Sequence, residues 1–152
     1  MWIARKYTKR IESAIKTRPV VLITGVRQTG KSSLLRKLLK NADYLTLDKV
    51  ALAEEAETNP TKFLERFKKQ VIIDEVQYAP SLFRELKVKV DENRGHKGKW
   101  ILTGSQQFSL MKGIQESYQL FYDISVIIII FRHVICIQDS NQRDHRRIGF
   151  TV

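Results

Sequence analysis

The chain has 152 residues, of which 43% are hydrophobic and 28% are charged. This balance is that of one ordinary globular domain, and it excludes collagen, a coiled coil and a wholly disordered chain. Lys and Arg number 27 against 16 Asp and Glu, so the net charge is +11. Such a charge favours an anionic partner, such as nucleic acid, a nucleotide phosphate or an acidic membrane surface. Solvated Lys and Arg on ordinary helices are an equal alternative.

One cysteine, Cys136, cannot form an intramolecular disulfide, and the three histidines do not have metal-ligand spacing. We therefore expect a reducing compartment and no structural zinc. The start, MWIARKYTKR, lacks the apolar core of a signal peptide. The longest apolar run, Val126 to Phe131, is far shorter than the ~20 residues of a membrane-spanning helix. The sequence therefore predicts a cytoplasmic chain with no membrane span.

Apolar runs alternate with helical patterns along the chain, which is typical of an α/β fold with a parallel sheet. An opening helix is predicted because apolar residues recur every four positions, at Ile3, Tyr7, Ile11 and Ile15. Pro19 ends this helix. The next residues, 20–24, read VVLIT, a short run of the kind found in strands that are buried on both faces.

A glycine-containing loop follows this strand. Residues 25–32 read GVRQTGKS and precede an amphipathic helical pattern, so the GxxxxGK[ST] motif lies between a strand and a helix. Gly25 and Gly30 allow the turn, backbone N–H groups surround the phosphates, and Lys31 reaches the β and γ oxygens. The Ser32 hydroxyl can bind Mg²⁺. The motif predicts a phosphate-binding loop; the alternative is an ordinary turn that contains glycine.

Two carboxylates end a later strand. Residues 44–48 predict a second strand, and residues 52–57 and 60–67 predict short helices. The apolar run that follows ends in Asp74 and Glu75. This is the form of a Walker B element, in which the Asp holds the magnesium shell and the Glu orients and activates a water. The alternative is a strand that emerges into solvent with acidic residues.

Glu75, which directly follows Asp74, helps to distinguish an ATPase from a GTPase. A water-activating carboxylate at Glu75 suits hydrolysis of ATP, whereas a GTPase would show a DxxG switch and an NKxD-like guanine reader. Neither pattern occurs in this sequence. ATP is therefore the expected nucleotide.

A fourth strand, residues 100–103, follows a helix that is predicted to begin after Pro80 with Ser81 as its N-cap. This strand leads into Thr103 and Ser105. Because ligands of such sheets bind at the carboxyl ends of the strands, we expect one of these hydroxyls to sense the γ-phosphate or the attacking water. A turn or helix-capping role is the alternative.

Three segments carry a resemblance to a known family: GVRQTGKSSLLRKLL, VIIDEVQYAPSLFRELKVKVDENR and WILTGSQQFSLMKGIQES. They resemble the AAA-type ATPase family of bacteria and archaea, whose members join an N-terminal ATPase core to a C-terminal domain of unknown function. The resemblance covers residues 1 to about 117. It implies a three-layer α/β P-loop NTPase fold of the ASCE type, with a parallel sheet in the strand order 5-1-4-3-2. It also implies Mg²⁺·ATP as the ligand and hydrolysis to ADP and phosphate as the activity.

The resemblance also implies roles for single residues. Asp74 and Glu75 would form the Walker B pair, and residues 103–106 would form the sensor-like edge. With the chemistry of the motifs, we expect Ser32 and Asp74 to bind the metal. The expected catalytic residues are Glu75, Lys31, Thr103 and Ser105. The nucleotide loop would comprise Gly25, Val26, Arg27, Gln28, Thr29, Gly30, Lys31, Ser32 and Ser33.

The family pattern ends after Ser117. The family continues with a short stretch that contains an Arg, a fifth strand and a second domain, whereas this chain continues with an Ile-rich and then polar segment. We therefore expect an ATPase core over residues 1–117 and a divergent tail over residues 118–152 that is out of frame or truncated. Ser125 to Phe131 can supply the fifth strand, with a disordered end after it. Otherwise this apolar stretch is exposed and liable to aggregate.

AAA-type enzymes usually receive an arginine finger from a neighbouring subunit or domain, and such an arginine raises turnover by ~10³ to 10⁵. No arginine beyond Arg94 matches the family at such a place, so we expect the chain to bind nucleotide better than it hydrolyses it. A second copy of the chain in a homo-oligomer, or a protein partner that the sequence does not identify, could supply this arginine. The alternative function is a basic, nucleotide-dependent module that contacts nucleic-acid phosphates without sequence preference and without significant hydrolysis. Its candidate contacts are Arg5, Lys6, Lys9, Arg10, Lys97 and Lys99.

Overall fold

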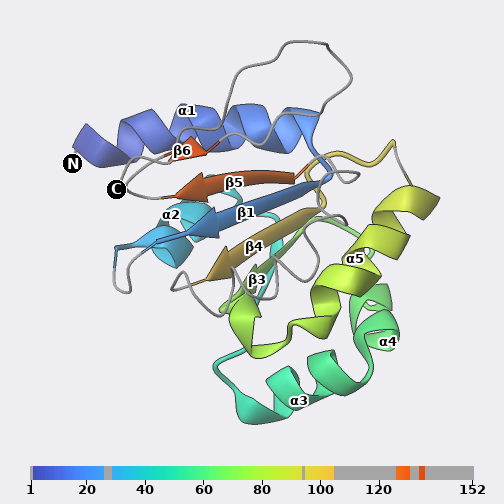
Figure 1. Ribbon diagram of the computed structural model, residues 1–152. Coiled ribbons are helices and arrows are strands. Elements are labelled where there is room, and N and C mark those ends of the chain that lie inside the picture. The colour runs from blue at the N-terminus through green and yellow to red at the C-terminus, as the bar shows by residue number, and fades with distance from the viewer. Residues whose placement is uncertain (1, 26–28, 94, 105–125, 131–133, 136–152) are drawn as a thin grey trace.

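The computed structural model describes residues 2–25, 29–93, 95–104, 126–130 and 134–135. Helices cover both faces of one sheet, which gives three layers (Figure 1). The helices are α1 (Trp2–Thr17), α2 (Lys31–Leu38), α3 (Val50–Thr58), α4 (Pro60–Glu65) and α5 (Ser81–Glu92). No helix in these ranges combines the length and the apolar character that crossing a membrane requires.

The sheet has the order β2-β3-β4-β1-β5-β6. Its strands are β1 (Val20–Thr24), β2 (Asp43–Thr46), β3 (Val71–Asp74), β4 (Trp100–Gly104), β5 (Val126–Ile130) and β6 (Val134–Ile135). The first five strands pair in parallel, and β6 pairs antiparallel to β5. The predicted α/β class and the order 5-1-4-3-2 are therefore confirmed. The antiparallel edge strand β6 was not predicted.

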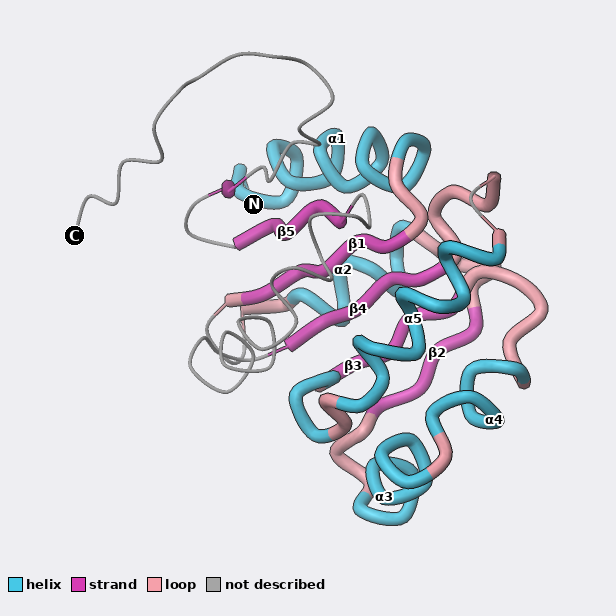
Figure 2. Tube along the Cα trace, turned by 45° about the vertical axis from the view of Figure 1, so that its right-hand side comes forward, coloured by secondary structure: helices cyan, strands magenta, loops and turns pink. Residues whose placement is uncertain are grey.

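The side chains of the central strands divide between two hydrophobic clusters. One set packs with α1 and α2, and it includes Val21, Ile23, Ile72 and Ile101. The other set packs with α3, α4 and α5, and it includes Val20, Leu22, Val71, Ile73, Trp100 and Leu102. Because successive side chains of a strand point to opposite faces, Asp74 and Thr103 lie on the same face as Ile72 and Ile101. Both polar residues therefore lie on the face that packs against α1 and α2. Figure 2 shows α2 and α5 on opposite faces of the sheet.

Most predicted elements form where the sequence places them. On the predicted apolar face of α1, Ile11 is fully buried, and Tyr7 and Ile15 are half-buried; the side chain of Ile3 lies outside the described residues. The predicted fifth strand forms as Val126–Ile130, beside β1. Apart from β6, the remainder of the predicted tail lies outside the described ranges.

The predicted cap of α5 is wrong. The helix begins at Ser81 itself, and the N-cap position is occupied by Pro80. Glu57 of α3 takes the place of a local cap, because its carboxylate accepts hydrogen bonds from the Ser81 N–H (2.9 Å) and from the Ser81 hydroxyl (2.8 Å). A carboxylate is favourable at this end of a helix.

A tight turn before β4 holds the end of α1 in place. The Gly98 N–H donates to the carbonyl of Arg18 at 2.7 Å, and Gly98 has a φ of +64°. A Cβ at this position would lie 2.5 Å from both Cγ2 and the carbonyl oxygen of Ile15. Only glycine fits here, because both the backbone conformation and the close approach of α1 exclude a side chain.

We predict that Gly98→Ala lowers the free energy of unfolding by about 3 kcal/mol, because the new methyl group forces α1 away from the turn and strains the backbone. Urea denaturation measures the loss. Gly95→Ala is the matched control, since no atom lies within 4 Å of its added Cβ. Equal stability of the two variants would show that this turn does not fix α1.

Candidate functional site

Two glycines of positive φ flank the loop between β1 and α2. Gly25 has a φ of 152° and Gly30 a φ of 79°. Gly30 occupies the N-cap of α2 without a side-chain cap, and the first hydrogen bond of the helix runs from the Leu34 N–H to the Gly30 carbonyl at 2.9 Å. The amides of a first helical turn have no intrahelical acceptor and attract anions. Of the predicted loop residues, 26–28 (Val26, Arg27 and Gln28) lie outside the described ranges.

Lys31 lies folded against this loop. Its Nζ donates to the carbonyl of Gly25 at 3.0 Å and to the hydroxyl of Thr29 at 3.4 Å, and the residue is only 5% exposed. Burial lowers the pKa of Lys31, while the carboxylates of Glu75 and Asp74 act in the opposite direction and favour the charged form. The ammonium thus sits at the carboxyl end of β1, within the field of the acidic pair.

Asp74 ends β3 as a buried carboxylate that is 6% exposed. The hydroxyl of Thr103 donates to Oδ1, and the hydroxyl of Tyr44 donates to Oδ2 at 2.8 Å. The three residues meet because they lie on one face of the neighbouring parallel strands β2, β3 and β4. Two hydroxyl donors fix the carboxylate and leave further lone pairs on both oxygens for a cation or a water.

Tyr44 is itself held as a donor. Burial and its hydrogen bond to Asp74 raise the pKa of Tyr44 to about 12. The hydroxyl therefore keeps its proton at neutral pH. On the other side, the guanidinium of Arg36 in α2 lies 4.9 Å from the centre of the Tyr44 ring. Tyr44 thus links the helix that follows the loop to the carboxylate at the end of β3.

Glu75 follows β3 in the left-handed region, with a φ of 58°. A non-glycine residue in this region costs of order 1–3 kcal/mol and persists only where its surroundings hold it. Here the chain continues into a short 3-10 helix, Val76–Tyr78. The side-chain amide of Gln77 donates to Oε2 of Glu75. The half-buried Glu75 carboxylate is therefore oriented by its neighbour two residues on.

The structure brings Lys31, Asp74, Glu75 and Thr103 together at the carboxyl edge of the sheet. Ser32 is half-buried and Ser33 exposed on the first turn of α2, whereas Ser105 lies outside the described residues. Thr103 is fully buried against Asp74, so its hydroxyl positions that carboxylate. The sequence reasoning missed Tyr44 and Gln77. The position of Tyr44 in its strand was the signal that could have found it. Tyr44 lies two residues before Thr46, which pairs with Asp74, so the side chains of Tyr44 and Asp74 share one face of the sheet.

The donor atoms at this edge fit Mg²⁺. Mg²⁺ prefers oxygen ligands and is usually bound through one or two carboxylates together with substrate phosphates. Asp74 supplies a buried carboxylate, and Ser32 supplies a hydroxyl on the first turn of α2. Among the residues that the structure describes, no group of three or more His, Cys, Asp or Glu could form an all-protein cage. Asp74 and Ser32 thus offer oxygen atoms of the kind that Mg²⁺ accepts.

This sheet, with a glycine loop between β1 and α2 and a carboxylate at the end of β3, has the fold of P-loop NTPases. Two solved structures share it at a TM-score of 0.52 and 18% identity: the Walker-type ATPase PABY2304 of Pyrococcus abyssi, and a DNA replication initiation factor. The first similarity covers 82% of this chain and 52% of the other, and the second covers 84% and 45%. At such low identity the likeness shows the fold alone.

Residues 17–127 match the AAA domain family, and the chain belongs to that family. The match reaches into β5, beyond Ser117, where the sequence pattern was expected to end. Two mycobacterial relatives are 36% identical over 88 residues: the uncharacterized proteins Rv2008c of Mycobacterium tuberculosis and Mb2031c of Mycobacterium bovis. The aligned part is 57% of this chain and 20% of each relative. The chain thus spans about a fifth of their length.

We predict that Thr103→Val lowers the free energy of unfolding by about 1–3 kcal/mol, because a buried carboxylate loses a donor that water cannot replace. Urea denaturation at neutral pH measures the effect. Tyr44→Phe removes the other donor but should cost less, since Tyr44 is 38% exposed and water can take over its hydrogen bond. Equal losses in the two variants would contradict this difference in burial.

Proposed function

We propose that this chain binds Mg²⁺·ATP at the loop of residues 25–33 and hydrolyses it slowly to ADP and phosphate. One observation carries the proposal: the buried ammonium of Lys31 and the buried carboxylate of Asp74 lie at the same edge of the sheet. Each is oriented by hydrogen bonds, to Gly25 for the lysine and from Thr103 and Tyr44 for the aspartate. The family and the fold support the same reading.

In this proposal the loop binds the phosphates through charge and backbone amides. The uncapped first turn of α2 offers N–H groups, and Lys31 offers a charge that is already desolvated and directed by the carbonyl of Gly25. Little reorganisation is then needed when the phosphates arrive. ATP is favoured over GTP because the sequence has a Glu after the Walker B Asp and no guanine-reading motif.

Ser32 and Asp74 would hold the magnesium ion, which supplies charge that stabilises the β and γ oxygens during transfer. Thr103 and Tyr44 keep the Asp74 carboxylate in one orientation, so both act as positioning residues. Glu75 would orient the attacking water and accept its proton, with Gln77 holding Oε2 and leaving Oε1 for the water. Ser105, next after β4 in the sequence, is our proposed contact to the γ-phosphate.

Hydrolysis is proposed to be slow because no arginine beyond Arg94 matches the family at the place of an arginine finger. A second copy of the chain, or another protein, would supply it, which raises turnover by ~10³ to 10⁵. The basic residues considered for nucleic acid are divided by the structure: Lys9, Arg10 and Lys97 are exposed, whereas Lys99 is half-buried. Side chains 5 and 6 (Arg5 and Lys6) lie outside the described part. Binding to nucleic acid stays a secondary prediction.

We predict that calorimetric titration shows micromolar binding of Mg²⁺·ATP to the purified chain, and that Lys31→Ala abolishes it because the phosphates lose their buried counter-charge. Lys37→Ala is the matched control, since Lys37 is an exposed lysine of the same helix. GTP should bind more weakly than ATP. Equal binding to the wild type and to Lys31→Ala would contradict the proposed loop.

A further variant separates nucleotide binding from hydrolysis. Glu75→Gln should bind Mg²⁺·ATP as the wild type does and lose the residual turnover, which we expect to lie below about 1 s⁻¹ in the wild type. A faster turnover that survives in Glu75→Gln would exclude Glu75 as the residue that activates water.

A further inference from the structure

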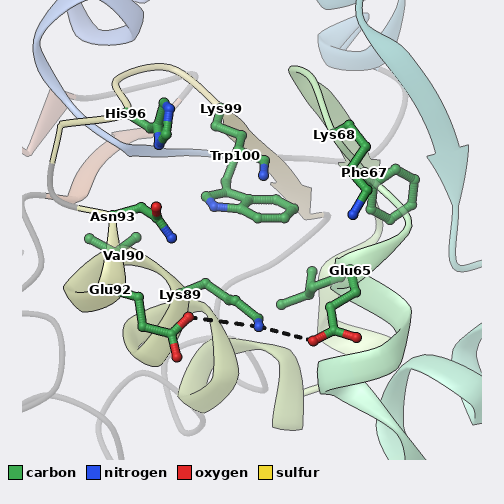
Figure 3. A pocket seen from close by; sticks show the side chains of 11 residues that line it. Glu65, Phe67, Lys68, Lys89, Val90, Glu92, Asn93, His96, Lys99 and Trp100 are labelled. Atoms are coloured by element: carbon green, nitrogen blue, oxygen red, sulfur yellow. Dashed lines mark hydrogen bonds and ion pairs between the residues drawn. The ribbon is translucent and has the colours of Figure 1, made fainter.

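A cavity of about 200 Å³ lies at the amino end of the strands, between α4, α5 and the start of β4 (Figure 3). Trp100, the first residue of β4, lines it and pairs with Val20 at the start of β1. The nucleotide loop follows Thr24 at the other end of β1, roughly 13 Å farther along the strand. The cavity is therefore separate from the proposed ATP site.

Trp100 presents a hydrogen-bond donor to this cavity. The residue is 3% exposed, and its indole N–H, which can only donate, has no acceptor among the described residues. Figure 3 shows the indole lying across the cavity, with its nitrogen on the side of Asn93. An oxygen atom of a ligand in the cavity would accept a hydrogen bond from this N–H.

Three lysines surround the same ring. The ammonium of Lys99 lies 4.7 Å from the centre of the Trp100 indole, and Lys68 and Lys89 line the cavity beside it. Burial and the charges of Lys68 and Lys89 lower the pKa of Lys99. Positive charge is thus concentrated at this cavity, although burial and mutual repulsion disfavour the charged form of Lys99.

Among the described residues, carboxylates pair with only one of these three lysines. Lys89 pairs with Glu65 at 3.3 Å and with Glu92 at 3.8 Å (Figure 3). Lys68 and Lys99 form no ion pair with any residue that the structure describes. Two positive charges without a carboxylate partner, next to an indole N–H, match a phosphate group. A phosphomonoester carries about −1.5 to −2 charge and a backbone phosphodiester about −1, and both offer several acceptor oxygens.

We propose that this cavity binds a phosphate group, held by Lys68, Lys99 and the indole N–H of Trp100. The phosphate belongs either to a small molecule or to the backbone of a nucleic-acid strand. The proposal does not rest on ATP binding, because no residue of the nucleotide loop lines the cavity.

The indole N–H resonance of Trp100 reports on this site directly. The chain has only two tryptophans, and Trp2→Phe assigns the signals. Titration with inorganic phosphate, followed by NMR, should give a saturable shift of the Trp100 signal. Lys68→Met and Lys99→Met should each weaken the binding about tenfold, the effect of losing one charge-assisted hydrogen bond. Lys68 is exposed, so its loss should not affect folding.

Lys97→Met is the matched control, since Lys97 is exposed, lies two residues from Lys99 and does not line the cavity. It should titrate like the wild type. Lys31→Ala should also retain the shift, which excludes phosphate bound at the nucleotide loop as its cause. No saturable shift in the wild type, or equal affinities in Lys99→Met and Lys97→Met, would overturn the proposal.

A short single-stranded oligonucleotide then distinguishes the two sources. Displacement of inorganic phosphate from the Trp100 site by the oligonucleotide would support a nucleic-acid backbone as the ligand. Binding of inorganic phosphate that the oligonucleotide does not affect would support a small phosphorylated molecule.

Discussion

A carboxylate removed from water is stable only if other groups solvate it, and Asp74 is such a carboxylate. It lies at the end of β3, where Thr103 of β4 and Tyr44 of β2 both donate to it. These three side chains meet only if the neighbouring strands keep their parallel register. A shift of one residue would turn Asp74 to the opposite face, against the apolar side chains of α3, α4 and α5. The same register therefore determines both the packing of the core and the position of the acidic pair.

The strand β4 runs from the lysine-rich cavity to the proposed nucleotide site. At its carboxyl end, Thr103 faces α2 and holds Asp74. At its amino end, Trp100 faces α4 and α5 and lines the lysine-rich cavity. The two functional proposals thus use opposite faces and opposite ends of a single strand. In these two proposals, part of the net charge of +11 serves two separate binding sites, at Lys31 and around Lys99.

Much of this fold could be predicted because its signals are local. The β-branched runs mark buried strands, and the glycine loop followed by Lys31 and Ser32 marks the start of α2. The features that were missed depend on contacts between distant segments. Glu57 caps α5 from another helix, and the hydroxyl of Tyr44 reaches Asp74 from a neighbouring strand. Neither partner is visible in the local pattern, since each is fixed by how the elements pack.

The central claim is that the loop carrying Lys31 and the buried Asp74 form one site for Mg²⁺·ATP. The most direct test measures the affinity for ATP with and without Mg²⁺, in the wild type and in Asp74→Asn. We predict that Mg²⁺ tightens binding at least about tenfold in the wild type and has little effect in Asp74→Asn, because the variant loses the carboxylate that holds the ion. The same Mg²⁺ effect in both proteins would contradict the account.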